Sequence, residues 1–204
     1  LVMIEDCIRH ILKRKHGMKE PKFADIKKYY YDNLVDGTLD TNDIEVYKNV
    51  FWNKNYCSTF QFTNSGAQDL AASSKPKSIE DLSVITSIWR PGPLSSGVDK
   101  EYIEAMNSNE EYYGHPLLKD VLKDTKGFLI FQESIPAIVN KLGKDISLDE
   151  GNELRKVLTK KGTGKEQEVK DRIYKKYVDG CIEKGIDKKI YDLIWFKMAK
   201  FATY

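Results

Sequence analysis

The stretch that shows most clearly how this chain folds is Ser147-Leu148-Asp149-Glu150-Gly151-Asn152-Glu153-Leu154-Arg155-Lys156-Val157-Leu158-Thr159-Lys160-Lys161-Gly162-Thr163-Gly164-Lys165. Ser147 and Glu150 have the S-x-x-E spacing of a capping box, which predicts that a helix begins here. Because a helix turns by ~100° per residue, three apolar side chains fall on one arc: Leu154, Val157 and Leu158. The glycines that follow predict the end of the helix. The stretch therefore predicts an amphipathic helix that runs into a loop of small residues.

The opposite arc of this predicted helix is basic. It carries Arg155, Lys156, Thr159 and Lys160, and Lys161 and Lys165 follow on the loop. From 155 to 176 the chain has nine basic and three acidic residues, a net charge of +6. Such a face suits a polyphosphate or a nucleic-acid backbone, which charge can position without reading sequence. A solvated helix face is the alternative, and local charge does not decide between the two.

Apolar residues recur at helical spacing along almost the whole chain, so the predicted fold class is mainly α. We expect helices within 1–15, 22–34, 44–51, 78–89, 134–143, 165–184 and 187–203. One of them is capped by Ser134 and holds Pro136 in its first turn. The run Gly127–Phe131 fits either a short strand or the start of a buried helix. The chain is divided into a helical segment, 1–42, and a helical domain, 43–204, that forms one packed unit.

The composition is that of a globular protein. The chain has 204 residues, of which 41% are hydrophobic and 31% charged, and its net charge is +2. A chain of this length buries roughly 70% of its unfolded surface. No apolar run approaches the ~18 residues of a membrane span. These numbers exclude disordered and membrane-spanning classes. The chain begins at Leu1, and its last predicted helix runs into Tyr204, so we expect it to be part of something longer.

Neither the cysteines nor the histidines have the spacing of a metal site or a disulfide framework. The three cysteines are widely separated and form no C-x-x-C pair: Cys7, Cys57 and Cys181. We expect them to be buried thiols in a reducing cytosol. The three histidines have no metal-ligand spacing to cysteines or carboxylates: His10, His16 and His115. The sequence therefore predicts no metal ligand in this chain.

Two further patterns are open to two interpretations each. Phe60-Gln61-Phe62, followed by Ser65-Gly66, is either a platform on which bases stack or two rings that pack into a core. Arg90 precedes Pro91-Gly92-Pro93, which ends a helix. Arg90 is therefore either an anion contact on a stiff loop or simply the last residue of that helix.

Taken in order, the motifs resemble one family over nearly the whole chain. They are Phe60-Gln61-Phe62, Ser65-Gly66, Ile79-Glu80-Asp81-Leu82, Arg90-Pro91-Gly92-Pro93-Leu94, His115-Pro116-Leu117-Leu118, Thr125-Lys126-Gly127, Phe131-Gln132-Glu133, Leu154-Arg155-Lys156 with Lys160-Lys161, and Phe201-Ala202-Thr203-Tyr204. This succession resembles the family C replicative DNA polymerases, the family of the bacterial DNA polymerase III alpha subunit. Each motif alone is weak, but their collinear order is specific.

The resemblance implies a helical fingers region, 43–204, preceded by a segment, 1–42, that follows the palm. In that family the fingers help to bind the incoming deoxynucleoside triphosphate (dNTP) and the template during DNA replication. Arg155 and Lys156 match a basic pair that faces the triphosphate, and Lys160 and Lys161 match the lysine cluster after it. Arg90 matches the family's Arg-Pro-Gly-Pro motif, whose role is functional or architectural, and we expect it to assist phosphate binding. Three others match motif positions that are functional or architectural: Gln61, Gln132 and Glu133.

The sequence also departs from the family pattern, which marks it as a divergent member. The departures are Thr63, Phe131, Pro136, Lys156 and Thr203. Lys156 keeps the charge of a frequent arginine but not its bidentate phosphate geometry.

The resemblance implies that catalysis depends on residues outside this chain. The family's catalytic carboxylates lie in the palm, and no Asp-x-Asp motif occurs in this chain. The parent enzyme would therefore be a cytoplasmic nucleotidyltransferase that uses Mg²⁺ held by those carboxylates. Its partners would be primer–template DNA, dNTP and the palm and thumb domains, with no membrane. We expect no catalytic residue here and an inactive isolated segment. The alternative is a free-standing helical nucleic-acid-binding or interaction module without polymerase chemistry.

Overall fold

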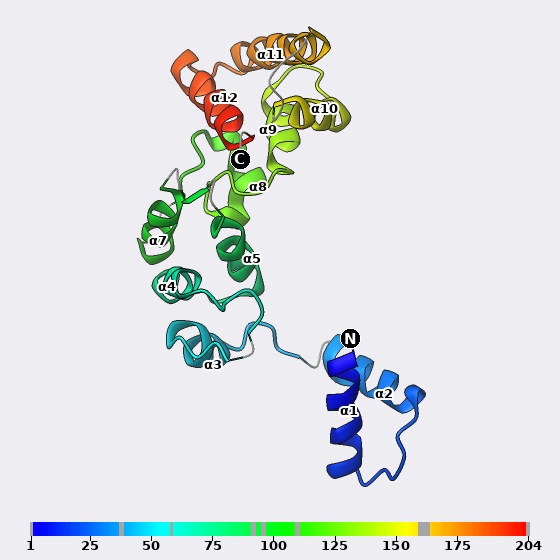
Figure 1. Ribbon diagram of the computed structural model, residues 1–204. Coiled ribbons are helices and arrows are strands. Elements are labelled where there is room, and N and C mark those ends of the chain that lie inside the picture. Colours follow the sequence, from blue (N-terminus) through cyan, green and yellow to red (C-terminus); the bar gives the residue numbers. More distant parts are fainter. Residues whose placement is uncertain are drawn as a thin grey trace. The chain divides into compact units, whose positions relative to one another are not determined.

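The computed structural model describes residues 2–36, 39–57, 59–90, 93–94, 97–108, 111–158 and 164–202. These residues form helices joined by turns and extended segments, and no strand occurs among them (Figure 1). The predicted mainly-α fold is therefore confirmed. Contacts between residues divide the chain into two compact units, Leu1–Asp43 and Ile44–Tyr204. Each unit has its own core.

The N-terminal unit contains two helices and a small core. Its elements are α1 (Val2–Arg14), α2 (Phe23–Tyr30) and the π-helical turn η1 (Tyr31–Val35). Ile8, Leu12 and Ile26 form the core of this unit. Arg9 ties the connecting loop to α1, because its guanidinium donates to Glu5 at 2.7 Å and to the carbonyl of Pro21 at 3.0 Å.

The first part of the second unit is built around aromatic residues. Its elements are α3 (Ile44–Val46), the π-helical η2 (Tyr47–Trp52), α4 (Ser65–Ser74), α5 (Ile79–Ile88) and α7 (Val98–Ser108). The rings of Tyr56 and Phe62 stack with centroids 5.3 Å apart. We call this cluster of buried side chains the aromatic core; its aromatic members are Tyr47, Phe51, Tyr56, Phe62, Tyr102 and Phe128. Six of its described members come from α4 and α5: Ala67, Leu70, Ala71, Val84, Ile85 and Ile88.

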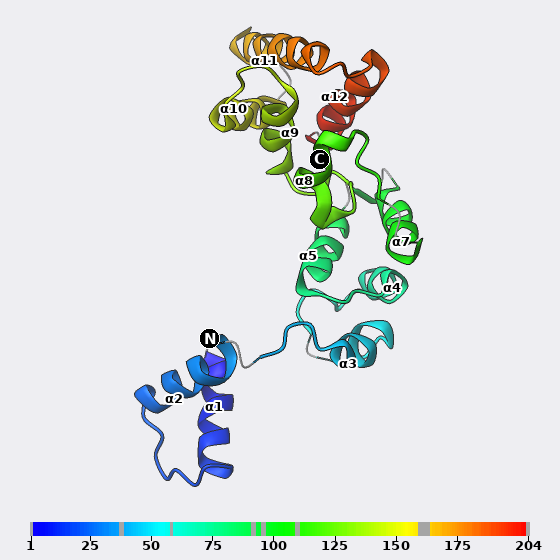
Figure 2. The ribbon, with the colours of Figure 1, turned by 180° about the vertical axis from the view of Figure 1, so that it is seen from behind.

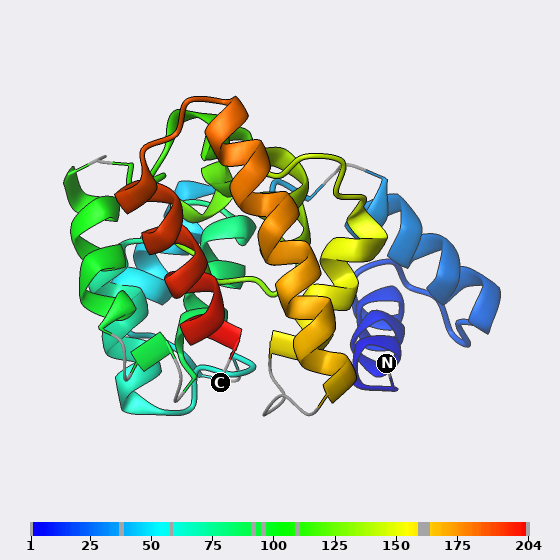
Figure 3. The same cartoon turned by 90° about the horizontal axis from the view of Figure 1, so that it is seen from above.

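The second part of this unit contains the stretch that opened the sequence analysis. Its elements are η3 (Pro116–Leu118), α8 (Lys119–Leu122), η4 (Lys123–Thr125), α9 (Ser134–Leu142), α10 (Leu148–Leu158), α11 (Gly164–Glu183) and α12 (Lys188–Ala202). Figure 2 shows α9 to α12 gathered at one end of this unit, and in Figure 3 α11 lies between α10 and α12. Their shared core, here the aliphatic core, includes Ile135, Leu142, Leu154, Ile173 and Tyr177, all fully buried.

The run Gly127–Phe131 is neither a strand nor the start of a helix. It is an irregular connection between η4 and α9, and both Phe128 and Ile130 point into the aromatic core. Gly127 has φ +93°, and an added Cβ would lie 2.3 Å from the carbonyl carbon of Tyr112. Tyr112 also donates its backbone N–H to the carbonyl of Lys126 at 2.9 Å. The close approach of these two backbones explains the glycine at 127, and burial in the aromatic core explains Phe128 and Ile130.

Two smaller expectations need correction. Ser134 is the first residue of α9 and not its cap, since Glu133 occupies the cap position without a side-chain capping bond. Pro136 does lie in the first turn, as predicted. Cys181 is buried, but Cys7 and Cys57 are exposed, so the prediction of buried thiols is wrong for those two. Their helix and turn positions simply face outward. In the described part of the chain, no helix is both long and apolar enough to cross a membrane.

Candidate functional site

Helix α10 begins at the predicted capping box. The backbone N–H of Glu150 donates to Ser147 Oγ, and the N–H of Ser147 donates to Glu150 Oε2, both at 3.1 Å. Glu150 also accepts from Lys176 Nζ on α11 at 2.7 Å. The hydrogen bond from Lys176, assisted by that from the Ser147 N–H, holds the pKa of Glu150 below its ordinary value. The start of α10 is therefore fixed both to its own first turn and to α11.

The two faces of α10 are divided as the sequence predicts. Leu154, Val157 and Leu158 belong to the aliphatic core, with Leu154 fully buried. Arg155 is half-buried and Lys156 is exposed. Both lie in the last turn, where a positive charge is also favourable to the helix dipole. The last turn of α10 thus presents two basic side chains on a helix whose opposite face is anchored in the core.

A glycine brings α10 close to α9. A Cβ added at Gly151 would lie 2.7 Å from the Cα of Pro136 on α9, so only glycine permits this approach. As a result, the first turn of α9 packs directly against α10. Pro136 is tolerated there because the first residues of a helix need no intrahelical donor.

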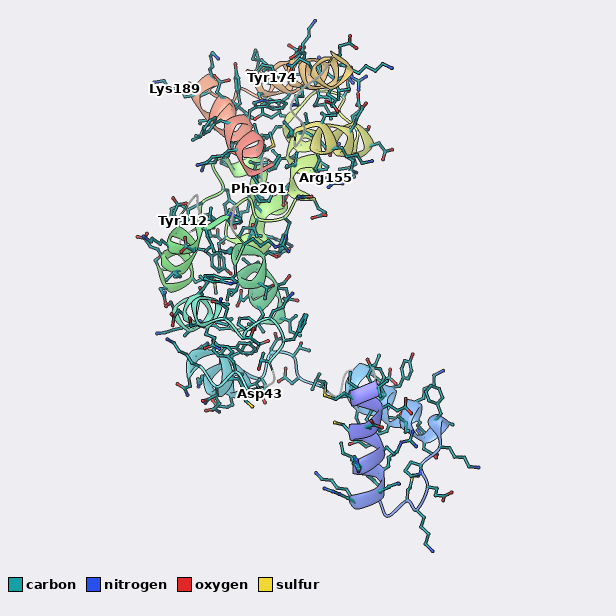
Figure 4. All side chains as sticks on the ribbon, in the orientation of Figure 1. Asp43, Tyr112, Arg155, Tyr174, Lys189 and Phe201 are labelled. Carbon is teal, nitrogen blue, oxygen red and sulfur yellow. The ribbon has the colours of Figure 1, made fainter. Side chains whose placement is uncertain are left out.

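This packing joins two of the predicted site residues. Arg155 Nη1 on α10 donates to Gln132 Oε1 at 3.0 Å, and Gln132 lies in the turn just before α9. Arg155 is labelled beside α10 in Figure 4. Gln132 and the adjacent Glu133 are both exposed. Sequence reasoning marked Arg155 and Gln132 separately and did not predict their contact. We call Arg155, Lys156 and Gln132 the α10 edge.

The other sequence-predicted positions do not join the α10 edge in any described contact. Gln61 is exposed in a turn with φ +68°, and Arg90 is exposed at the end of α5. Both lie on elements that surround the aromatic core. Lys160 and Lys161 lie outside the described residues.

The Phe60-Gln61-Phe62 motif matches neither of its two interpretations as a whole. Phe62 is 4% exposed and packs in the aromatic core, whereas Phe60 is 84% exposed. Gln61 turns the chain between them with its positive φ. One ring is therefore structural, and the other is open to solvent.

Part of the basic block 155–176 is used to hold the helices together. Arg172 on α11 pairs with Glu153 on α10 at 2.6 Å. Lys176 pairs with Glu150 and also donates to the carbonyl of Asp145 at 3.1 Å. Beyond the block, Lys184 donates to the carbonyls of Leu142 and Gly143 at 3.1 and 2.9 Å, at the end of α9. The charge count alone could not separate these structural cations from the α10 edge.

The described residues give no reason to place a metal in this chain. Within the described ranges, no group of three or more histidine, cysteine, aspartate or glutamate side chains is close enough to hold an ion. His115 has a structural role, because its Nδ1 accepts from the backbone N–H of Leu117 at 3.3 Å at the start of η3.

Comparison with known proteins identifies the family. The family model described as the bacterial DNA polymerase III alpha subunit finger domain matches residues 2–185. The chain is 31% identical over 180 residues to the DNA polymerase III subunit alpha of Campylobacter jejuni, covering 88% of this chain and 14% of that protein. It is 37% identical over 146 residues to the Chlamydia trachomatis subunit, covering 71% of this chain and 11% of that protein.

A third relative extends the likeness to nearly the whole sequence. The Aquifex aeolicus DNA polymerase III subunit alpha is 29% identical over 198 residues, covering 97% of this chain and 15% of that protein. The chain thus spans about one seventh of the length of these relatives. The finger-domain match spans both compact units of the described structure. The chain belongs to the bacterial DNA polymerase III alpha subunit finger-domain family, as a divergent member.

Proposed function

We propose that this chain is the fingers segment of a DNA-directed DNA polymerase and that its α10 edge binds the triphosphate of the incoming dNTP. The observation that carries the proposal is the position of Arg155. It stands on a helix whose opposite face is buried, and its guanidinium is held by Gln132 at 3.0 Å. A guanidinium fixed on a rigid element suits bidentate recognition of a phosphate oxygen pair.

The other basic positions extend the same function. Lys156 adds a charge next to Arg155, and Lys160 and Lys161 follow it in sequence. Lysine binds phosphate as a point charge, so these residues would neutralise the triphosphate and nearby backbone without fixing its geometry. Arg90, from the other part of the unit, would assist.

The parent enzyme would be a nucleotidyltransferase of DNA replication that acts on primer–template DNA. Its palm and thumb would be the structural partners of this segment, and carboxylates outside this chain would hold Mg²⁺. When bound, that metal would stabilise charge on the reacting phosphates. The residues of this chain would bind and orient the nucleotide, and the isolated segment would be inactive. We place the enzyme in the cytoplasm, where replication proceeds.

The proposal is tested by nucleotide kinetics in the complete polymerase that carries this segment. Arg155→Ala is expected to lower kcat/KM for dNTP by about 100-fold, the effect of losing a charged group that stabilises a reacting phosphate. The DNA dissociation constant should change by less than about 3-fold, since one phosphate contact contributes little to DNA affinity. If nucleotide kinetics stay at wild type while DNA affinity falls, the triphosphate role is wrong.

A free-standing nucleic-acid-binding module is the second candidate, and the exposure of Phe60 favours it. An aromatic ring that is 84% exposed can stack on an unpaired base. In that case, replacing Lys156, Lys160 and Lys161 together with Gln would reduce the salt dependence of DNA binding, because fewer counterions are released. The same variant would leave any nucleotide affinity unchanged. A loss of nucleotide affinity would support the polymerase function instead, whether or not the salt dependence of DNA binding also changes.

A further inference from the structure

The contact between Gln132 and Arg155 joins segments that are far apart in sequence. The two residues are separated by 23 positions, and the hydrogen bond crosses from the turn before α9 to the last turn of α10. Among the described residues, the Arg155 guanidinium donates its hydrogen bond to Gln132. The contact engages Nη1, so the other N–H groups of the guanidinium remain available for a ligand.

A neutral partner suits an arginine that must bind an anion. A carboxylate at this position would hold the guanidinium too, but it would cancel the charge that attracts a phosphate. The amide oxygen of Gln132 restricts the long side chain without cancelling that charge. The structure contains the contrasting case nearby, because Arg172 is paired with the carboxylate of Glu153 at 2.6 Å.

The start of α9, which lies beside this contact, offers no competing anion site. A helix N-terminus can bind phosphate through its unpaired N–H groups. Here the N–H of Ser134 donates to the carbonyl of Phe131 at 3.1 Å, and the N–H of Ile135 donates to the carbonyl of Gln132 at 3.2 Å. Pro136 has no N–H. The donor for an anion at this place is therefore the arginine and not the helix end.

From these contacts we infer that Gln132 is a positioning residue, which orients Arg155 for the phosphates of the incoming nucleotide. This inference rests on the proposed function of the α10 edge. It gives Gln132 a functional role, whereas the sequence left open whether this motif position is functional or architectural. Close packing at Gly151 and Pro136 keeps the two segments at the distance that the contact requires.

The test uses two substitutions of Gln132 in the complete polymerase. Gln132→Met keeps the length of the side chain and removes the acceptor, and Gln132→Glu keeps the acceptor and adds a negative charge. Each is expected to raise the dissociation constant for dNTP in single-turnover kinetics by about 3- to 10-fold, the range of a lost or neutralised charged hydrogen bond. Affinity for primer–template DNA and the melting temperature should stay at wild type. Gln167→Met is the matched control, since Gln167 is exposed and bonds only within α11, to Asp171 at 2.8 Å.

A double-mutant cycle separates positioning from a direct contact. In the Arg155→Ala background, the neutral substitution Gln132→Met should not weaken dNTP binding further. Full additivity, or wild-type nucleotide affinity for Gln132→Met and Gln132→Glu, would overturn the positioning role while leaving the proposed function of Arg155 intact. If Arg155→Ala itself keeps wild-type nucleotide affinity, the proposed function of the site fails first, and the two failures are thereby distinguished.

Discussion

The N-terminal unit and the α9–α11 region both consist of helices with amphipathic sequences, but the two are stabilised very differently. In the N-terminal unit, three side chains form the core, Ile8, Leu12 and Ile26, whereas Val2 and Phe23 are 73% and 68% exposed. In the α9–α11 region, the helices share the aliphatic core and are also joined by ion pairs and by contacts between backbones.

The difference shows what holds Arg155, the proposed phosphate-binding residue, in place. A helical stripe of apolar residues predicts which face of a helix turns inward. In the N-terminal unit Ile8 and Ile26 follow this prediction, whereas Val2 and Phe23 do not. The stripe does not predict how closely the helices approach or how strongly they are joined. Those properties come from Gly151 and Gly180, which let backbones touch, and from cations that pair across helices. Arg155 lies in the region that has a shared aliphatic core, backbone contacts at glycines and ion pairs between helices.

The largest expected effect tests the backbone contact between α11 and the end of α9. A Cβ at Gly180 would lie 2.2 Å from the carbonyl carbon of Gly143, and backbone cannot move aside as a flexible side chain can. Gly180→Ala should therefore lower the free energy of unfolding by more than about 3 kcal/mol, as severe overpacking does. Denaturant unfolding of the chain measures this. Gly164→Ala is the control, since a Cβ there meets no described atom within 4 Å and its stability should equal or exceed wild type.

The next prediction compares the two cores directly. Leu154 is fully buried in the aliphatic core, and Leu12 is 5% exposed in the small core of the N-terminal unit. Leu154→Ala should lower the free energy of unfolding by about 3 kcal/mol. Leu12→Ala should lower it by about half of that, because a small core can collapse into the space that is left. Leu148, on the same helix as Leu154 and 56% exposed, provides the control, and Leu148→Ala should stay within about 0.5 kcal/mol of wild type. Equal losses at Leu154 and Leu12 would contradict the comparison.

A smaller effect is expected at the pair that joins α10 to α11. The Lys176–Glu150 side chains are 36% and 25% exposed, so water screens the pair only in part. A double-mutant cycle with Lys176→Met and Glu150→Gln should give a coupling of about 1 kcal/mol. The exposed i,i+4 pair of Lys188 and Asp192 should give about 0.3–0.5 kcal/mol. A coupling no larger at Lys176 than at Lys188 would show that the helices are not held by this pair.

The same pair predicts a pH dependence of stability. The pKa of Glu150 is lowered in the folded chain by its hydrogen bond to Lys176, so the unfolded chain binds the proton more readily. The stabilisation is then fully present above the unfolded pKa of about 4.3 and is lost as the pH falls through the lower folded pKa. The stability difference between wild type and Glu150→Gln should shrink between pH 5 and pH 2 in acid titrations of unfolding. A constant difference over that range would rule out this contribution.

Much of the local structure could be predicted from sequence, because capping and periodicity act over a few residues. The start of α10 at Ser147 and Glu150 and the burial of Leu154 both follow from such spacing. The contact between Gln132 and Arg155 could not be predicted, because it depends on how α9 packs against α10. The same holds for Phe60 and Phe62, which are separated by a turn at Gln61 that no local rule for glutamine predicts.

The charge pattern likewise does not predict which basic residues are paired within the fold. Arg155 and Arg172 belong to one basic block, and local charge alone does not distinguish them. The fold gives Arg155 a neutral partner and Arg172 a carboxylate. Which cation is available to a ligand is therefore a property of tertiary packing and not of composition.

The central claim is that the α10 edge, and not the basic block as a whole, binds the incoming nucleotide. Its most direct test is the dissociation constant for dNTP in single-turnover incorporation by the complete polymerase, with Arg155→Ala and Arg172→Ala compared side by side. We predict that Arg155→Ala weakens nucleotide binding by at least about 10-fold, as expected for a lost charge-assisted contact, and that Arg172→Ala stays within about 2-fold of wild type. Equal weakening by the two substitutions, or none by Arg155→Ala, would contradict the claim.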